Sequence, residues 1–208
     1  KISSKQNLKN NEVNVLFLDN LKEIKFKPMW LNNETEKFLT QNSKFRKIKQ
    51  PYLFETQFGV FLIIPILKKT NNLSLDIENQ GGLIFDKIST DFYDNINFYI
   101  DDELYFSNLL RGFCLKSYKF ENYKSNTKKR KIKNILVFSQ NFSKIKSSFQ
   151  SDLNLVKGVY FARDLVWKPA NILNPKSFAE ECKKLKKFGV KVQILNESNL
   201  KKIGMTSL

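Results

Sequence analysis

The chain has 208 residues, of which 41% are hydrophobic and 19 are phenylalanine, so it can bury a sizeable core and is not a disordered segment. It contains no histidine, which removes the commonest general base and metal ligand. The formal net charge is +16, and only four of the 36 basic residues are arginines, namely Arg46, Arg111, Arg130 and Arg163.

The composition also indicates the cellular compartment of the protein. Two cysteines, Cys114 and Cys182, are too few for a disulfide framework and suit a reducing compartment. The first residues have no apolar signal core, and the longest apolar run, residues 60–67, is interrupted by Pro65 and is too short to span a bilayer. A cytoplasmic protein without a membrane segment is therefore expected.

The first half of the chain alternates strand and helix patterns. Residues 13–18 are a β-branched and aromatic run that predicts a first strand. Asn33 is expected to cap a short helix that carries Phe38 and Leu39. Residues 52–56 and 60–64 are expected to form a hairpin, and the second of them, apolar on both faces, is expected to be a central strand.

The pattern then continues through a polar stretch. Residues 68–82, which end in Gly81 and Gly82, are expected to be a loop, followed by a short helix at 83–88. Residues 96–100 and 135–138 predict further strands, with a helix at 103–115 and a charged loop at 124–133 between them. Strands that alternate with helices predict an α/β fold, and the hairpin makes the sheet mixed.

A helix near residues 152–167 is predicted to organise the rest of the chain. Its expected apolar stripe, spaced by three or four residues, consists of Leu155, Val159, Ala162 and Val166. Asp152 is expected to cap its start, and Pro169 should end it near Trp167. Asn174 and Pro175 then supply the N-cap and the first position of a new helix.

After this joint one further step of structure is expected. Phe178, Cys182 and Leu185 should form the buried side of a helix that ends at Gly189. Residues 190–194 alternate in polarity and predict a strand, and a last helix should run from Asn196 to residue 204. This segment is interpreted as the first helix-strand-helix of a second α/β domain that is cut short.

No residue is assigned a catalytic, metal-binding or substrate-binding role. The carboxylates at residues 101–103 are expected to cap a helix, and Glu180 and Glu181 to lie on the wet face of theirs. Cys182 is expected in a core, and neither cysteine has a neighbour in sequence that activates a thiolate. The glycines form no phosphate-binding motif, and Arg163 and Asp164 should each contact a different partner, because adjacent helical residues do not face each other.

Several short motifs resemble the leucyl aminopeptidase family of metallopeptidases. They are ARDLV at residues 162–166, PAN at 169–171, LNP at 173–175 and Phe178 with Ala179. Gly112, Leu115, SYKF at 117–120 and YK at 123–124 resemble the stretch before the last N-terminal strand of the family. Residues 190–195 and 200–205 resemble the opening of its catalytic domain, although residues 206–207 are Thr-Ser where Gly-Ala is typical.

The resemblance implies an N-terminal macro-like α/β domain at residues 1–150, a connector helix and joint at 151–174, and a truncated peptidase domain at 175–208. Family members are homo-hexamers that remove N-terminal amino acids from peptides with two divalent metal ions, zinc or manganese. Their metal ligands, catalytic lysine and catalytic arginine fall outside the matched region. The resemblance therefore implies a fragment of an aminopeptidase that binds no metal and is inactive alone.

Two further expectations complete the interpretation. The alternative function is a stand-alone basic macro-like module that binds nucleic acid or a nucleotide through the net charge and residues 128–133. It is not favoured, because lysine accompanies abundant Asn, Ile and Phe, as in an AT-rich genome. Trp167, which shares a helical face with Val156, Tyr160 and Arg163, is expected to act as a wedge between the two domains.

Overall fold

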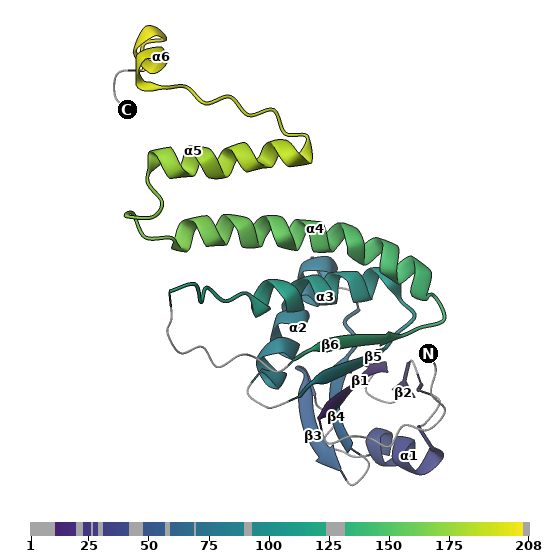
Figure 1. The fold of residues 1–208 in the computed structure, drawn as a ribbon. Coiled ribbons are helices and arrows are strands. Elements are labelled where there is room, and N and C mark those ends of the chain that lie inside the picture. The colour runs from purple at the N-terminus through teal and green to yellow at the C-terminus, as the bar shows by residue number, and fades with distance from the viewer. Residues whose placement is uncertain are drawn as a thin grey trace. The chain divides into compact units, whose positions relative to one another are not determined.

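The computed structural model describes residues 11–19, 23–25, 27–28, 31–41, 48–56, 59–68, 70–89, 93–123 and 132–205 (Figure 1). The chain divides into two compact units, residues 1–160 and residues 161–208. Each unit is described by itself. The expected division at residues 150 and 174 stays a prediction.

One mixed sheet forms the centre of the first unit. Its six strands are β1 (Glu12–Asp19), β2 (Glu23–Ile24), β3 (Tyr52–Thr56), β4 (Gly59–Pro65), β5 (Asn95–Tyr99) and β6 (Asn134–Phe138). Their order is β3-β4-β1-β5-β6, and the short β2 pairs with β1. Strands β4, β1, β5 and β6 are parallel, whereas β3 is antiparallel to β4. The predicted α/β class, mixed sheet and β3–β4 hairpin are confirmed; the turn at residues 57–58 lies outside the described residues.

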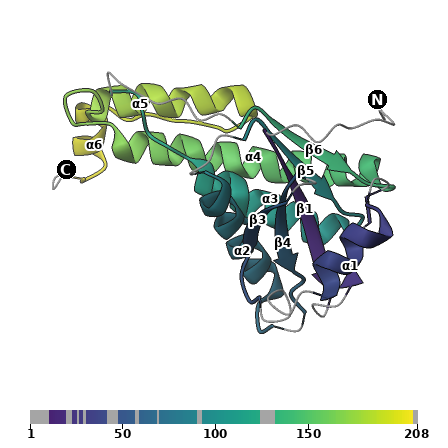
Figure 2. The same cartoon turned by 90° about the horizontal axis from the view of Figure 1, so that it is seen from below.

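Helices cover both faces of this sheet (Figures 1 and 2). The helices of the unit are α1 (Asn33–Gln41), α2 (Leu73–Ile88), α3 (Glu103–Ser117) and α4 (Phe142–Trp167), whose last turns belong to the second unit. Val15 of β1 and Phe98 of β5 belong to the core that α2, α3 and α4 complete with Ile84, Phe106 and Ile145. On the other face Leu16 and Ile63 pack with Leu39 of α1. Successive side chains of β1 point to opposite faces of the sheet, and both faces are covered, so all of residues 13–18 are buried.

The loop predicted at residues 68–82 is wrong, because α2 occupies most of it. Asn72 caps this helix by accepting a hydrogen bond from the Leu75 N–H at 3.2 Å. The glycines that suggested a turn serve a helix crossing instead. A Cβ atom built on Gly81 would lie 1.9 Å from the Leu109 carbonyl oxygen of α3, and one on Gly112 would lie 1.8 Å from that of Glu78. The absent side chains let the two backbones approach closely.

The starts of α3 and α1 agree with the sequence to within a residue, whereas the start of α4 does not. Asp102 caps α3 through the Tyr105 N–H at 3.0 Å, as predicted. The cap of α1 is Asn32, which accepts from the Thr35 N–H at 2.8 Å, and not the expected Asn33. Helix α4 ends at Trp167 as expected, but it begins at Phe142 and not at Asp152. Asp152 lies inside α4, where its carboxylate binds the side chain of Arg111 of α3.

The second unit is helical. It contains α5 (Pro175–Lys183), a 3₁₀ helix η2 (Lys184–Phe188) and α6 (Glu197–Lys202), and Gly189 ends η2 with a φ of 82°. The caps predicted at Asn174 and Asn196 are confirmed. The strand predicted at residues 190–194 is wrong, since these residues are irregular and pair with no described strand. Phe178 is exposed and not buried, because none of the residues of α5 is fully covered.

Candidate functional site

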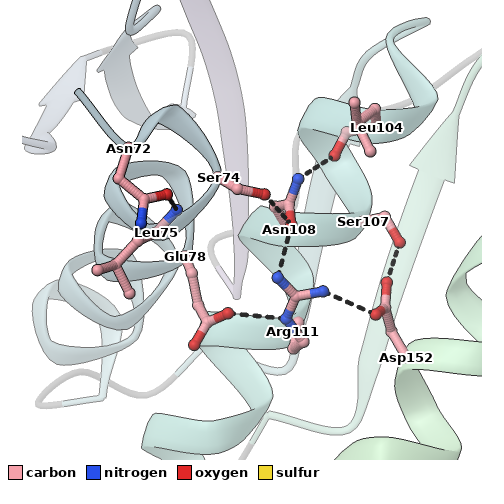
Figure 3. A network of polar contacts seen from close by, with 9 residues as sticks. All are labelled: Asn72, Ser74, Leu75, Glu78, Leu104, Ser107, Asn108, Arg111 and Asp152. Carbon is pink, nitrogen blue, oxygen red and sulfur yellow. Dashed lines mark hydrogen bonds and ion pairs between the residues drawn. The ribbon is translucent and has the colours of Figure 1, made fainter. Parts of the chain in front are cut away.

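A network of polar side chains in the first unit is centred on Arg111 of α3 (Figure 3). Its guanidinium donates from Nε to Glu78 of α2 at 2.7 Å and from Nη1 to Asp152 of α4 at 2.8 Å. A third donor, Nη2, reaches the side-chain oxygen of Asn108 at 2.6 Å. One planar cation therefore joins three helices, which suits the fixed fork of donors that arginine carries.

The acceptors around Arg111 are held in place by further hydrogen bonds. The Ser74 hydroxyl donates to the Asn108 side-chain oxygen at 2.9 Å, and the Asn108 amide donates to the Leu104 carbonyl at 2.9 Å. Ser107 donates its hydroxyl to the second oxygen of Asp152, and Ser148 donates to Ser107 at 3.3 Å. The Asn108 amide and the Asp152 carboxylate are thus oriented toward the arginine.

The electrostatics of the site keep the arginine charged. Burial alone would lower the pKa of Arg111, but the hydrogen bonds to Glu78 and Asp152 outweigh it and raise the pKa above its usual value. The side chain is 20% exposed, so the ion pairs are only partly screened by water. We refer to Glu78, Asn108, Arg111 and Asp152 as the Arg111 cluster.

Helix α4 is attached to the first unit along the face that carries Asp152. Ile145 and Val156 are buried on this face, and Phe149 packs against the same core as Ile145. These residues are spaced by three or four, so they form one stripe of the helix. The predicted apolar stripe does not lie against this core, because Leu155 is exposed and Val166, also exposed, belongs to the second unit. Periodicity alone could not distinguish the two stripes.

A second attachment lies one helical turn beyond Val156. The Tyr160 hydroxyl donates to the Cys114 carbonyl oxygen and lies 2.9 Å from the Ser117 hydroxyl. Its ring packs against Tyr118, with centroids 5.1 Å apart. Together with Asp152, these contacts attach α4 to α3 along most of the length of α3.

The second unit has its own joint after α4. Asn174 accepts from the Ser177 N–H at 3.1 Å, while the Ser177 hydroxyl accepts from the Asn174 N–H at 2.9 Å, which is a capping box. Lys168 forms an ion pair with Glu181 at 3.0 Å across the Pro-Ala-Asn turn. Hydrogen bonds from Lys184 and Lys168 lower the pKa of Glu181. Glu180 is exposed as predicted, but Glu181 has a structural partner and is not simply solvated.

The residues considered for chemistry have structural roles where they are described. Asp101 accepts hydrogen bonds from the Ser139 hydroxyl at 2.8 Å and the Gln140 N–H at 2.6 Å. Within the described ranges, no group of three or more His, Cys, Asp or Glu side chains could hold a metal ion, so the residues present do not fit the metal pair that the resemblance implies. Residues 124–131, which include most of the basic loop, lie outside the described residues.

The cysteines and the hydrophobicity of the helices complete the survey. Both cysteines are free, and burial raises the pKa of the Cys114 thiol to about 11, which keeps it protonated at neutral pH. Cys182 is half-buried on α5, which agrees only in part with the core position expected for it. None of the described helices is long and apolar enough to cross a bilayer.

Sequence reasoning did not single out the Arg111 cluster. A signal was present, because arginine is rare in this lysine-rich chain and Arg111 stands among apolar residues of a predicted helix. The partners could not be found from the sequence, since Glu78 and Asp152 are 33 and 41 positions away.

The fold is of the α/β class. A unit with a mixed sheet continues through α4 into a second, helical unit. Residues 160–208 match the model of the cytosol aminopeptidase family, catalytic domain. A probable cytosol aminopeptidase of Brucella melitensis is 42% identical over 102 residues, which are 47% of this chain and 21% of that protein. One from Phytoplasma mali is 37% identical over 106 residues, which are 49% of this chain and 21% of that protein.

Solved structures agree in fold. A mutant of tomato leucine aminopeptidase matches 98% of this chain and 45% of its own with a TM-score of 0.71 and 18% identity. The bottromycin maturation enzyme BotP matches 93% of this chain and 41% of its own, with a TM-score of 0.65 and 14% identity. In sequence, part of the chain is thus similar to cytosol aminopeptidases, and in fold it is similar to a leucine aminopeptidase. The matched segment spans about a fifth of the length of the curated relatives.

Proposed function

We propose that the chain is the N-terminal part of a metal-dependent leucyl aminopeptidase that removes N-terminal amino acids from peptides. The similarity of residues 160–208 to the catalytic-domain model of the family is the observation that carries this proposal. The names of the curated relatives and the fold of tomato leucine aminopeptidase support it. We further propose that the catalytic and metal-binding residues lie outside this segment, and that the protein is cytoplasmic.

Within such an enzyme, residues 1–208 would serve folding, domain connection and oligomer assembly. The Arg111 cluster and Tyr160 support the connecting role, because they attach α4 to a rigid α/β unit before the chain enters the segment that matches the catalytic family. These contacts hold α4 on the α/β unit as far as Tyr160. The proposal includes a macro-like N-terminal domain, a homo-hexamer, and zinc or manganese as the metal.

The proposal is tested by comparing two proteins for release of leucine from a leucyl amide. One is this 208-residue chain, and the other is a longer product of the same gene that includes a complete catalytic domain. We expect manganese-dependent turnover, abolished by a chelator, in the longer protein only. Metal-dependent turnover by the pure 208-residue chain would show that it contains a site we have not assigned. Absence of turnover in the folded, metal-loaded longer protein would refute the peptidase function.

A further inference from the structure

Strand β6 ends the sheet on one side. It pairs in parallel with β5, from Asn134 opposite Asn95 to Phe138 opposite Tyr99, and no described strand pairs with its other edge. In Figure 2, β6 lies at the border of the sheet, beyond β5. Within the part of the chain that the structure describes, the outer edge of β6 therefore carries backbone groups that no strand occupies.

The hydrogen bonds on the inner edge identify which groups these are. The Asn134 N–H donates to the Asp94 carbonyl at 3.1 Å, and the Phe138 carbonyl accepts from the Ile100 N–H at 3.1 Å. Because the backbone groups of successive strand residues point in alternate directions, the N–H and C=O groups of Ile135 and Val137 point to the outer edge. The outer edge thus presents two donors and two acceptors at regular spacing.

The two edges of the sheet differ in how they are protected against pairing. Strand β3, at the opposite edge, follows Pro51 and contains the exposed Glu55, and both features disfavour the addition of a strand. The four residues 135–138 of β6 are all apolar and include neither a charge nor a proline. Leu136 is 39% exposed on the sheet face opposite to α2, α3 and α4. By these criteria β6 is open to pairing and β3 is not.

We propose that two copies of this chain associate by antiparallel pairing of their β6 strands about a two-fold axis at Leu136. In this register Ile135 of one copy lies opposite Val137 of the partner subunit, and the two residues exchange both of their backbone hydrogen bonds on each side of the axis. Leu136 faces its own counterpart across the axis in a non-hydrogen-bonded pair, where side chains are closest. The two sheets become one continuous sheet.

Charge complementarity favours a second copy over an unrelated strand. The same register places Lys133 opposite Ser139 of the partner subunit; the Lys133 side chain is 67% exposed and lies 3.4 Å from the Asp94 carboxylate of its own copy. Ser139 is hydrogen-bonded to Asp101, so a cation of one copy meets a carboxylate of the other at both ends of the pair. The strand is therefore complementary to itself in hydrogen bonding, in its apolar centre and in terminal charge. This pairing is independent of the proposed peptidase activity.

Sedimentation velocity of the 208-residue chain between about 1 and 200 μM tests the proposal, because a dimer must grow with concentration. Leu136→Lys and Leu136→Glu should each weaken dimerisation about tenfold or more, since like charges then lie directly opposite each other. Mixing the two variants should restore a dimer, because the charges across the axis become opposite. Leu104→Lys and Leu104→Glu, at a leucine that is 72% exposed on α3, are the matched controls and should leave dimerisation unchanged.

Three results would overturn the proposal: a wild-type chain that stays monomeric throughout this range, a dimer that both Leu136 variants leave intact, or a mixture that fails to re-form it. Circular dichroism establishes that the variants are folded. Should either variant unfold, amide hydrogen exchange of the wild-type chain decides the question. The amides of Ile135 and Val137 must then become more protected as the concentration rises, and unchanged protection of these two amides in a dimer would refute pairing through β6.

Discussion

A single guanidinium at Arg111 joins three helices, and its loss should therefore be costly. Arg111→Ala leaves Glu78 and Asp152 partly buried without their cation. We expect the free energy of unfolding of the 208-residue chain to fall by about 2–3 kcal/mol. Arg111→Lys should lower the free energy of unfolding by less, because an ammonium keeps the charge but cannot reach all three acceptors. Urea denaturation measures both changes.

Lys116→Ala is the matched control on the same helix. Lys116 pairs with Asp86 at 3.0 Å, but about half of each side chain is exposed. Such a pair contributes at most about 0.5–1 kcal/mol, so this variant should unfold close to the wild type. If Arg111→Ala were as mild as Lys116→Ala, the Arg111 cluster would not attach α4 in the way described.

Two buried side chains predict how stability depends on alkaline pH. Burial raises the pKa of Cys114 from 9.0 to about 11 and that of Tyr105 from 10.0 to about 12. The unfolded chain then loses these protons at lower pH than the folded chain. Stability is therefore complete below pH 9 and decreases as the pH rises toward 11, by about 1 kcal/mol per pH unit for Cys114.

This pH dependence is measured by urea denaturation between pH 8 and pH 10. Cys114→Ala should remove most of the decrease between pH 9 and pH 10, where the contribution of Tyr105 is the smaller of the two. Cys182→Ala is the control and should keep the decrease. An identical profile for the wild type and Cys114→Ala would show that the Cys114 thiol is not protected by folding.

Local signals in the sequence predicted several helix caps correctly, although not those expected at Asn33 and Asp152. The caps at Asp102, Asn174 and Asn196 were correct, because a cap depends on the residue itself and on amides three positions away. The role of Arg111 was not predicted, because the residues that it binds are distant in sequence. The same distinction separates Glu180, correctly placed in solvent, from Glu181, whose partner Lys168 lies across a turn.

At the scale of elements, errors arose where a neighbour decides the structure. Helix α2 was missed because Gly81 and Gly82 suggest a turn, whereas the backbone of α3 makes a small residue necessary at Gly81. Helix α4 starts earlier than expected, since Ile145 and Phe149 pack on the core despite the polar residues around them. The strand expected at 190–194 did not form, because a strand exists only when another pairs with it.

The crossing of α2 and α3 gives a prediction at this scale. Gly81→Ala would place a Cβ atom 1.9 Å from the Leu109 carbonyl oxygen, so the helices must separate. We expect a loss of about 2–4 kcal/mol in the free energy of unfolding. Gly82→Ala is the matched control, because its Cβ atom would meet only Lys116 side-chain atoms at 3.7 Å or more.

Gly82→Ala should stabilise the chain by up to about 1 kcal/mol through helix propensity. Thermal and urea denaturation of the two variants measure the difference in sign. If Gly81→Ala were also stabilising, the close approach of α2 to α3 would be wrong, and the glycine would have no packing role.

At the scale of the whole molecule, the α/β class and the longer strands of the sheet could be predicted from hydrophobic periodicity, whereas α2 and β2 could not. The family could be recognised from the short motifs of the joint, and residues 160–208 also match the catalytic-domain model. What the chain binds or cleaves could not be derived from its own residues. Within the described part no cluster of metal-ligating side chains supplies that chemistry.

Trp167 tests whether the end of α4 serves a second domain. It is 63% exposed in this structure, next to Val166, which is 83% exposed, so two large apolar side chains end the helix in contact with solvent. We expect Trp167→Ala to change the free energy of unfolding of the 208-residue chain by less than about 1 kcal/mol, as for other exposed positions. In a longer protein with a complete catalytic domain, the same change should cost about 3–5 kcal/mol, because the indole would then be buried as a wedge. Urea denaturation of both proteins, each with and without the substitution, measures the difference. Equal and small effects in both would show that Trp167 is a surface residue and that the wedge hypothesis is wrong.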